Sequence, residues 1–587
     1  MIQTTARWLR GTVVALAVAT LAIAAAPVSA KSANPKLVPA DAAYVFSVPD
    51  VPAFWTAWKA NSIYTTYKKV VANPEVATQM ESFEKQLKTI ETALGFPLDG
   101  NTLSQVLKSA DVFVRAGESE DEVVVAFAFG VSDKEKLQKL LDLAEKAAIK
   151  AAAGDEDSTA TADAPAVKAV VEKHKDVEFR KVPGAYETPF YAQTGDLLLV
   201  TNNGAEMRAL IDRVKGDGGG QVLAGNAEYE RVEKALAAHP GEFYYVANPK
   251  AAYEMQGEIP GPMQGLQELV LKLQPDSIGG ASIKINATDI EAYSYMPFKP
   301  GSTSPLQELF KKHPSSKSIG VMDFAPAKAL VAMGTNLVDF PMFYEGLKTG
   351  LKESGLAGDA NLDDQLKQME EPLGFSVKND LLPAFGDEMG LFLNSFKMPA
   401  GGAEMPEVDA AIIFSVKDKA KMAKVLSGLE KMLNAQLGAL TAAMNDPSAG
   451  GQANAEAFKS EKAGNDTIKY VPLPMAPGLA PGFVLTDGHL LIGTSKDGLK
   501  KMLQAKAGEA SLTASAEYKA LLERVGTEAG VVQFANLSGI WDILLSVPDL
   551  ESARPVIEAL KVMKTAVSVQ RSEADGAWAG KSVLVLN

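Results

Sequence analysis

Gly195-Asp-Leu-Leu-Leu199 recurs 293 residues later as Gly488-His-Leu-Leu-Ile492, and this recurrence decides how the chain is organised. Each stretch is a short apolar run that opens on turn residues, as is typical of a buried strand. Self-similarity at a long spacing is typical of a chain built from repeated structural units. The two stretches therefore predict that the chain contains the same unit twice.

Five further pairs of short segments keep the same order, with offsets between 279 and 293 residues. They are Leu94-Gly95-Phe96 with Leu373-Gly374-Phe375, Val131-Ser-Asp-Lys134 with Val416-Lys-Asp-Lys419, Val182-Pro183 with Val471-Pro472, Ala227-Glu-Tyr229 with Ala516-Glu-Tyr518, and Ala247-Asn248 with Ala535-Asn536. Chance matches would not keep this order, so we infer a tandem duplication. The predicted boundaries are a first repeat at 31–299, a linker at 300–305 and a second repeat at 306–587.

The hydrophobic periodicity of the first repeat alternates between strand and helix patterns. Helices are expected around Phe54, up to Leu94, over Lys134–Ile149, from Glu206 and from Ala227. Strands are expected at Tyr44–Val48, Val112–Arg115, Val123–Phe129, three segments within 178–201, Phe243–Val246, Ile278–Ile285 and Ile290–Met296. Most strands follow one another through short turns, which favours an antiparallel sheet. The predicted fold class is α+β: two tandem homologous halves, each a largely antiparallel sheet with helices packed on one face.

Two low-complexity segments fall at equivalent places, after the third helix of each half. They cover residues 151–167 and 441–462 and are rich in Ala, with Asp, Asn and Gly. Neither contains enough apolar surface to order itself. We therefore predict that both are flexible inserts.

The repeated Leu-Gly-Phe motif, Leu94-Gly95-Phe96 and Leu373-Gly374-Phe375, follows a helical apolar stripe in both repeats. A glycine directly after a helix usually adopts positive φ and ends it. The aromatic residue is then expected to fold back onto the helix. The motif is predicted to be structural and to carry no chemistry.

The first thirty residues have the pattern of a secretory signal. Arg7 and Arg10 precede the apolar stretch Thr12–Ala26, and small residues end at Ala30. Such a stretch is too short to favour a membrane span, and no later apolar run approaches the ~20 residues that a span requires. The sequence predicts cleavage near Ala30 and an extracytoplasmic mature protein, either periplasmic or secreted, with no transmembrane span.

The composition excludes several classes of function. The 587 residues have a net charge of −14, which argues against a nucleic-acid partner, because phosphate binding needs a concentrated basic face. The chain has no Cys, so disulfides, thiol catalysis and cysteine metal sites are excluded.

Three segments resemble chemical motifs, and each has a better structural interpretation. Asp359 to Glu370 has the oxygen spacing of a calcium loop but lacks the required glycine, and the same apolar spacing in both repeats predicts a helix. Gly576–Ser582 is one residue short of a phosphate loop and is interpreted as a final hairpin. Ser82-Phe-Glu-Lys85 and Lys348-Thr-Gly350 are chance fragments of a serine-enzyme pattern, since its Ser-Asp-Asn element is absent.

The four histidines are scattered, without the i, i+4 pair that would hold a metal. His174, His239 and His313 have the surroundings of surface turns. His489 opens a strand, but its counterpart in the first repeat is Asp196, so it too is interpreted as a turn residue. No catalytic, cofactor-binding or metal-binding residue is assigned, and no cofactor is expected.

The start of the mature chain resembles a known family. Leu37-Val-Pro-Ala-Asp-Ala-Ala-Tyr-Val45 places a Pro-Ala-Asp turn before the first strand, and Gly488–Ser495 is a strand that leads into a helix. Both features resemble an uncharacterised bacterial exported family, a domain of unknown function. The second repeat departs from the pattern with Pro314-Ser-Ser. The resemblance implies a fold type and a compartment, and no catalytic residues.

These observations favour an exported, soluble, non-enzymatic binding or scaffold protein of the bacterial cell envelope. The recurring residues are mainly Gly, Leu, Phe, Pro and Tyr, which serve folding, and the repeats share no constellation of polar groups that would form a catalytic site. The cleft between the repeats is the expected binding surface. Its partner would be an envelope protein. The alternatives are a periplasmic carrier of lipid or another apolar ligand and, with less support, a hydrolase that uses a carboxylate pair.

Overall fold

The computed structural model describes most of the chain after the first 33 residues. It covers residues 34–586, apart from 72–87, 89–90, 93, 98, 120–121, 153–168, 183–188, 219, 257–276, 300–304, 314, 316–317, 354–361, 398–406, 446–457, 474–478, 509, 548–549 and 551–552. The predicted signal peptide and most of the predicted linker therefore lie outside the described residues.

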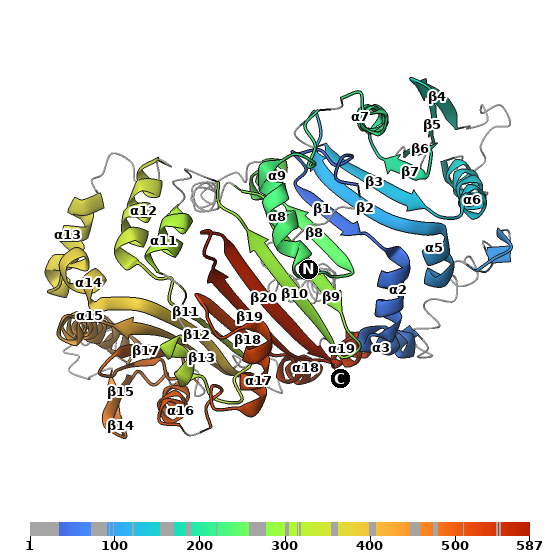
Figure 1. Ribbon diagram of the computed structural model, residues 1–587. Coiled ribbons are helices and arrows are strands. Elements are labelled where there is room, and N and C mark those ends of the chain that lie inside the picture. Colours follow the sequence, from blue (N-terminus) through green and yellow to red (C-terminus); the bar gives the residue numbers. More distant parts are fainter. Residues whose placement is uncertain are drawn as a thin grey trace.

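Twenty strands of the described residues form one continuous sheet, and every hydrogen-bonded pair in it is antiparallel (Figure 1). The first ten are β1 (Tyr44–Val48), β2 (Leu107–Ala116), β3 (Val123–Val131), β4 (Val170–His174), β5 (Val177–Lys181), β6 (Phe190–Thr194), β7 (Leu197–Thr201), β8 (Phe243–Ala247), β9 (Gly279–Ile285) and β10 (Asp289–Met296). The second ten are β11 (Val331–Thr335), β12 (Phe385–Lys397), β13 (Glu407–Val416), β14 (Lys459–Ala463), β15 (Asp466–Tyr470), β16 (Gly482–Leu485), β17 (His489–Gly493), β18 (Val531–Asn536), β19 (Met563–Ser572) and β20 (Trp578–Leu586).

The second ten strands pair according to the same plan as the first ten. In the first set β1 lies between β2 and β8, β3 pairs with β2 and β7, and β9 joins β8 to β10. In the second set β11 lies between β12 and β18, β13 pairs with β12 and β17, and β19 joins β18 to β20. Each pairing of the first set thus has a counterpart ten strands later.

The two sets meet where β10 and β20 lie side by side at the centre of the sheet (Figure 1). Eight residue pairs form this seam, from Asp289 opposite Val585 to Met296 opposite Trp578. Because the strand that ends each set pairs with its own counterpart, neither set keeps a free edge here. The halves are therefore joined by backbone hydrogen bonds and not by a linker alone.

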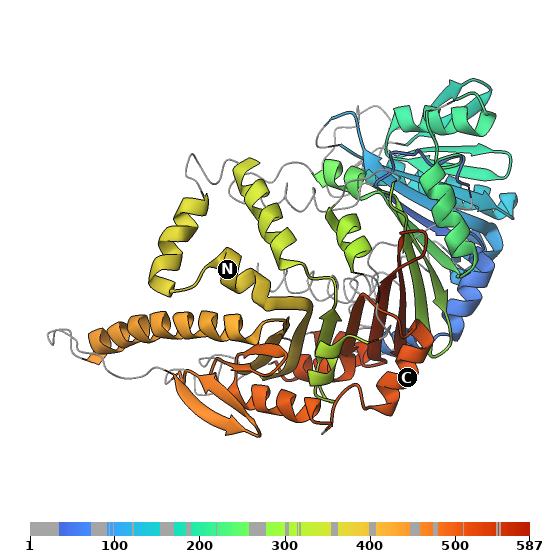
Figure 2. The same cartoon turned by 60° about the vertical axis from the view of Figure 1, so that its left-hand side comes forward.

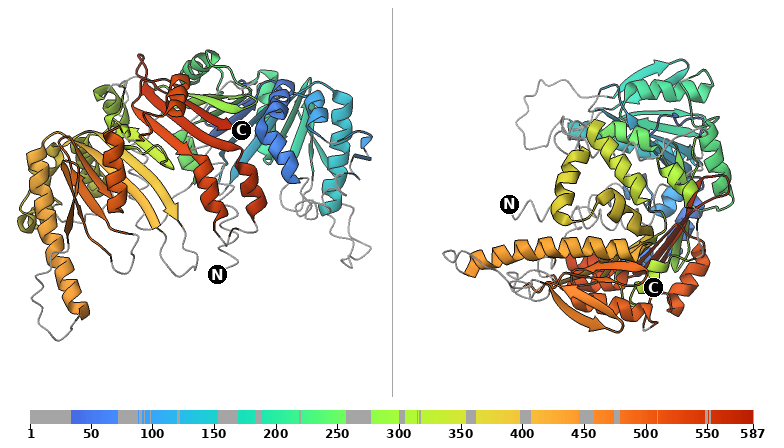
Figure 3. Two further views of the ribbon diagram at one scale, coloured as in Figure 1. Left: turned by 90° about the horizontal axis from the view of Figure 1, so that it is seen from below. Right: turned by 90° about the vertical axis from the view of Figure 1, so that its left-hand side faces the viewer.

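The helices are distributed over both faces of the sheet. They are α2 (Val51–Ala60), α3 (Ser62–Val71), α5 (Gly100–Val106), α6 (Lys134–Ala152), α7 (Gly204–Lys215), α8 (Ala227–Ala237), α9 (Pro249–Gln256), α11 (Pro305–Lys312), α12 (Phe340–Glu353), α13 (Leu362–Leu373), α14 (Leu382–Ala384), α15 (Lys419–Asn445), α16 (Lys496–Lys506), α17 (Ala516–Val525), α18 (Leu537–Leu545) and α19 (Arg554–Leu560), with a 3-10 turn at Gly320–Phe324 and a π turn at Val377–Leu381. Helices α6 and α15 project from one side at opposite ends of the sheet, as Figure 3 shows, and α15 extends well past the strands in Figure 2.

The antiparallel α+β prediction is confirmed, but the prediction that helices cover one face is wrong. On β20, Val583 belongs to the core that contains α17, whereas its neighbour Leu584 belongs to the core that contains α18. Successive side chains of a strand point to opposite faces, so helices bury both faces there. The unbroken apolar run at the end of β20 is typical of such two-sided burial.

Each half has its main core beneath the pair of helices that follows its small hairpins. In the first half, Met207 and Leu210 of α7 and Tyr229 of α8 are almost fully buried against Phe113 of β2. In the second half, Leu499 and Met502 of α16 and Tyr518 of α17 are buried against the strands in the same way. These cores fix the helices whose ends flank the seam.

Several predicted boundaries differ from the observed ones. The three strands predicted within 178–201 are present as β5, β6 and β7, but β4 at Val170–His174 was not predicted, because its polar sequence lacks an apolar alternation. Helix α15 continues through 441–445 and β14 begins at Lys459, so both ends of the predicted insert at 441–462 belong to regular elements. The Ala-rich end of α15 has high helix propensity, which the low-complexity interpretation ignored. Residues 151–152 end α6 for the same reason, and 153–167 lie outside the described residues.

The Leu-Gly-Phe motifs end helices as predicted. Gly95 and Gly374 have φ of +75° and +69°, and each backbone N–H donates to the carbonyl four residues earlier, at Glu91 and Glu370, over 2.9 Å. The predicted positive φ is thus confirmed. Phe375 is 6% exposed and lies against α15 at Gly428, so it buries itself on a neighbouring helix.

Candidate functional site

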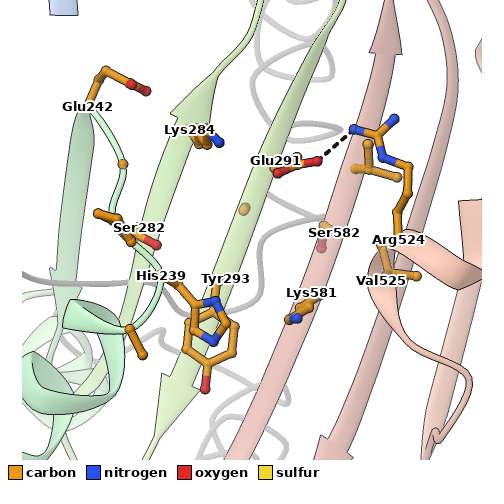
Figure 4. Close-up of a pocket in the computed structure, with 15 residues that line it drawn as sticks. His239, Glu242, Ser282, Lys284, Glu291, Tyr293, Arg524, Val525, Lys581 and Ser582 are labelled. Atoms are coloured by element: carbon orange, nitrogen blue, oxygen red, sulfur yellow. Dashed lines mark hydrogen bonds and ion pairs between the residues drawn. The ribbon is translucent and has the colours of Figure 1, made fainter. Parts of the chain in front are cut away.

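A groove follows the seam on the face covered by α8 and α17. Two adjoining cavities form it, with volumes of about 440 Å³ and 590 Å³, and both are lined by His239 and Tyr293. Residues from β9, β10, β19 and β20 form its floor, while the loop after α8 and the end of α17 form its walls (Figure 4). We call this the junction groove, since both halves contribute to it.

Two closely spaced rings, tilted by 33° to each other, lie at the centre of the junction groove. Tyr293 stands on β10, with Ser282 of β9 opposite it on one side and Lys581 of β20 on the other. His239 follows α8, and its ring centroid lies 3.8 Å from that of Tyr293 (Figure 4). The backbone N–H of His239 donates to the carbonyl of Leu236, which turns the chain back over the sheet. The ring pair therefore belongs to the first half, and a cation of the second half stands beside it.

The surroundings keep both rings neutral near pH 7. Burial lowers the pKa of His239, and the cations of Lys581 and Arg571 lower it further. Burial, together with the nearby Glu573, raises the pKa of Tyr293 to about 12. Two neutral rings in contact, next to cations, are a suitable surface for a flat ligand that carries a negative group.

Cations outnumber acids around the groove, although the chain as a whole has a net charge of −14. The cationic side chains are Arg231, Lys234, Lys284, Arg524, Arg571 and Lys581, and the acidic ones are Glu242, Glu291, Glu573 and Asp575. A cation-rich hollow in an acidic protein concentrates anionic ligands locally.

Three of the arginines are held by acids, and two of these contacts join the halves. Arg524 of α17 lies 3.0 Å from Asp289 and 2.7 Å from Glu291 of β10. Arg231 of α8 lies 3.4 Å from Asp575, in the turn between β19 and β20. Each half thus extends an arginine to the last hairpin of the other, which fixes the walls of the groove relative to its floor.

Asp575 has a second partner and Arg571 a local one. The Tyr295 hydroxyl donates to Asp575, and burial together with this hydrogen bond raises the pKa of Tyr295. Arg571 donates to Glu573 over 2.9 Å. Asp575 and Glu573, the acids at this end of the groove, therefore both have hydrogen-bond partners within the protein.

The three lysines of the groove differ from its arginines. Lys234, Lys284 and Lys581 form no ion pair with any residue that the structure describes. Lys284 is exposed, and Lys581 is half-buried beside Tyr293. Their ammonium groups are the cations that a bound anion could reach without displacing an existing partner.

Hydroxyl groups in the groove show no arrangement for nucleophilic attack. Ser582 donates to Ser568 on the neighbouring strand over 2.9 Å. The ring of His239 lies against that of Tyr293, and no hydrogen bond among the described residues joins it to a serine.

The histidines do not come together, as the sequence predicts, but His239 was misassigned. It does follow a helix, yet the turn folds over the seam, so the residue is half-buried in the groove and not at a simple surface turn. His489 is also half-buried. The other neighbours are Asp212 for His174 (2.8 Å), Asp387 for His313 (3.9 Å) and Phe324 for His489 (ring centroids 4.9 Å apart).

The motif-like segments take their predicted structural roles where they are described. Residues 362–373 form α13, Lys348-Thr-Gly350 lies within α12, and Gly576–Ser582 runs into β20. Asp359, and Ser82 with Lys85, lie outside the described residues. Within the described part of the chain, no three His, Asp or Glu side chains converge as metal ligands do. No described helix combines the length and apolar character of a membrane span.

Sequence reasoning expected a cleft between the halves but named none of its residues. His239, Tyr293, Arg524 and Lys581 come from four distant segments, and only the β10–β20 pairing brings them together. One signal was available: Lys581 interrupts the apolar run of the final strand.

The fold and the groove define an α+β protein with one long antiparallel sheet and a cation-rich hollow at its centre. The chain belongs to the family described as Protein of unknown function (DUF3352), whose model matches residues 8–448. No curated protein and no solved structure gives a significant match.

Proposed function

We propose that this is an exported, non-enzymatic binding protein of the bacterial cell envelope and that the junction groove holds its ligand. The observation that supports this most is the position of Lys284 and Lys581, which lack ion-pair partners among the described residues on either side of Tyr293. A ligand with an anionic group and a flat ring would contact both kinds of surface. The charges of the groove fit an acidic ligand or an acidic segment of an envelope protein.

The topology supports a duplication as the origin of this site. Each strand pairing of the first half recurs in the second, and the two terminal strands pair with each other. A duplicated unit whose last strands join creates one new surface at the join, and the groove occupies that surface. Neither half alone would contain it.

Calorimetric titration of the mature chain with 4-hydroxybenzoate and with phenyl phosphate tests the site. Both probes combine a ring with an anion, so binding is expected, and Lys581→Ala should weaken it about three- to tenfold through the loss of one close charge. Lys462→Ala on β14 is the matched control, since that lysine is exposed far from the groove. Equal affinities for the two variants, or no binding heat at millimolar probe, would contradict the groove as the seat.

The same titration addresses catalysis. A non-enzymatic protein leaves phenyl phosphate intact after prolonged incubation, so release of inorganic phosphate by the purified chain would revive a hydrolase.

Export rests on the first thirty residues, which lie outside the described part. Expression of the full chain in a bacterium, followed by envelope fractionation and N-terminal sequencing, should give a soluble product that begins near Lys31. A full-length chain in the cytoplasm would contradict export.

Carriage of an apolar ligand is a second candidate, supported by the other face of the sheet. Leu391, Ile412 and Ile492 stand opposite one another on adjacent strands, and Leu391 and Ile492 are 49% and 42% exposed. In the first half, Phe46 lies between Val112 and Tyr245 and is 37% exposed. Native mass spectrometry of the purified chain would reveal a retained lipid, and a bare polypeptide mass would remove this candidate.

A further inference from the structure

A second cavity lies entirely within the first half, away from the junction groove. Its volume is about 650 Å³. It is lined by the Pro-Ala-Asp turn that precedes β1, by two arginines and by the residues that begin α8 and α9. The lining residues used below are Asp41, Arg115, Arg213, Asn226, Asn248 and Lys250. We call it the N-terminal pocket.

Two guanidinium groups of the pocket are held rigidly from behind. Glu206 is fully buried, and its carboxylate lies 2.7 Å from Arg213 and 2.5 Å from Arg115. The Arg213 side chain is 4% exposed and also donates to the carbonyl of Leu37 over 2.9 Å. Arg115 is 24% exposed, so part of its guanidinium faces the pocket. An arginine whose orientation is fixed in advance loses little entropy when it binds an oxyanion.

Two helices begin at the pocket. Asn226 caps α8 by accepting from the N–H groups of Glu228 and Tyr229, and Asn248 caps α9 by accepting from Ala251. The positive ends of both helix dipoles therefore lie at this cavity. The caps already satisfy several of these N–H groups. The helices therefore contribute a positive electrostatic potential, while direct contacts to a ligand must come from side chains.

Lys250 supplies the third cation. It stands in the first turn of α9, is exposed, and forms no ion pair with the described residues. An acid also lines the pocket: Asp41, which is 70% exposed and lies 4.0 Å from Arg115. With Glu206 counted, the pocket still has three cations against two acids.

We propose that the N-terminal pocket binds a small oxyanion, the carboxylate or phosphate group of a ligand, between Arg115 and Lys250. Binding would displace Asp41, which is solvated and weakly held, and would leave the buried Glu206 contacts intact. The site is independent of the junction groove, and the two share no lining residue.

The second half lacks the groups that build this pocket. The residues at the positions of Glu206 and Arg213, counted from the caps Asn203 and Ser495, are Gly498 and Ala505. The proposal therefore predicts one oxyanion at this kind of site for each chain, and not two.

Calorimetric titration of the mature chain with inorganic phosphate and with citrate tests the proposal and separates the two anion classes. Lys250→Ala should weaken binding about three- to tenfold, and Asp41→Asn should strengthen it by a similar factor, because each changes one close charge. The control Lys139→Ala, an exposed lysine of α6, should leave affinity unchanged.

Two results would overturn the proposal. One is the absence of binding heat with either anion at millimolar concentration. The other is an equal effect of Lys250→Ala and Lys139→Ala. Lys581→Ala separates this site from the junction groove, since it should not alter phosphate binding here, and a loss of binding in that variant would place the anion in the groove.

Discussion

Each half buries a carboxylate at equivalent helices, but the groups that contact the carboxylate differ. They are cations in the first half and neutral hydrogen-bond donors in the second. In the first half the acid is Glu206, at the third residue after the cap of α7, and two arginines contact it. In the second half that helix position is Gly498, and the acid is Asp409, which reaches up from β13. The carboxylate thus comes from a helix in the first half and from a strand in the second, and in both halves it fills the space between the helix and the sheet.

The neighbours of the two acids differ accordingly. Asp409 is 9% exposed, and its described hydrogen-bond partners are neutral: Asn394 at 3.4 Å and Ser495 at 3.3 Å. It lies at the start of α16, whose dipole favours a negative charge. A Cβ on Gly498 would lie 1.8 Å from the Asp409 carboxylate, so only glycine admits it.

One topology therefore tolerates two different polar interiors when side-chain volume and charge are compensated together. An ionic arrangement with fixed arginines leaves cations at the surface, and the N-terminal pocket depends on them. A neutral arrangement leaves none. The halves therefore share a fold but not the capacity to bind an anion at this place.

Arg213→Met should have the largest effect, because it leaves the fully buried Glu206 with Arg115 alone. Breaking a buried ion pair costs about 3–5 kcal/mol, so the free energy of unfolding in denaturant should fall by about 3 kcal/mol. The control Arg208→Met, on the same helix, removes an exposed pair with Glu172 and should cost under about 1 kcal/mol. Equal losses would show that Glu206 does not depend on its cations.

Gly498→Ala tests the neutral arrangement of the second half. The added methyl collides with Asp409, and overpacking of this kind costs about 1–3 kcal/mol. Gly346→Ala in α12 is the control, since nothing lies near its Cβ, and it should not destabilise. In an Asp409→Ala background the penalty of Gly498→Ala should largely disappear, and full additivity would refute the contact.

Gly95→Ala and Gly374→Ala compare the halves where they should agree. Both glycines have positive φ with open space around the Cβ position, so each change should cost about 1 kcal/mol from backbone strain alone. Gly488→Ala, which has equally open space and no positive φ, is the control and should cost less. Unequal losses at Gly95 and Gly374 would show that the two motifs do not serve the same role.

Acidification should lower the free energy of unfolding through one histidine in each half. Burial lowers the pKa of His239 and of His489, with Lys581 and Lys506 respectively adding to the shift. The unfolded chain, with an ordinary histidine pKa of about 6.5, therefore binds protons first, and stability falls as the pH drops below that value.

Denaturation of His239→Asn and His489→Asn at pH 7.5 and 5.5 measures these contributions. Each variant should lose less stability between the two pH values than the parent chain does, by a small margin. If the parent chain and both variants lose the same free energy of unfolding between the two pH values, neither histidine contributes to the acid sensitivity.

Much of the fold could be predicted from the sequence, because it is written in local patterns. The order of β1, β2 and β3, the helix α6 and the glycine caps follow from periodicity and turn residues. The two-sided burial of β20 differs from the predicted single helix-covered face, although the uniformly apolar Val583–Leu586 is a signal for it. The groove could not be located, because it depends on which strand edges meet.

The seam has a mechanical consequence. Two-lobed proteins that close around a ligand bend at a flexible connection between the lobes. Here any such bend would have to break the eight-pair ladder between β10 and β20. The junction groove should therefore stay open and keep its shape. The molecular envelope from X-ray scattering should be the same with and without bound ligand.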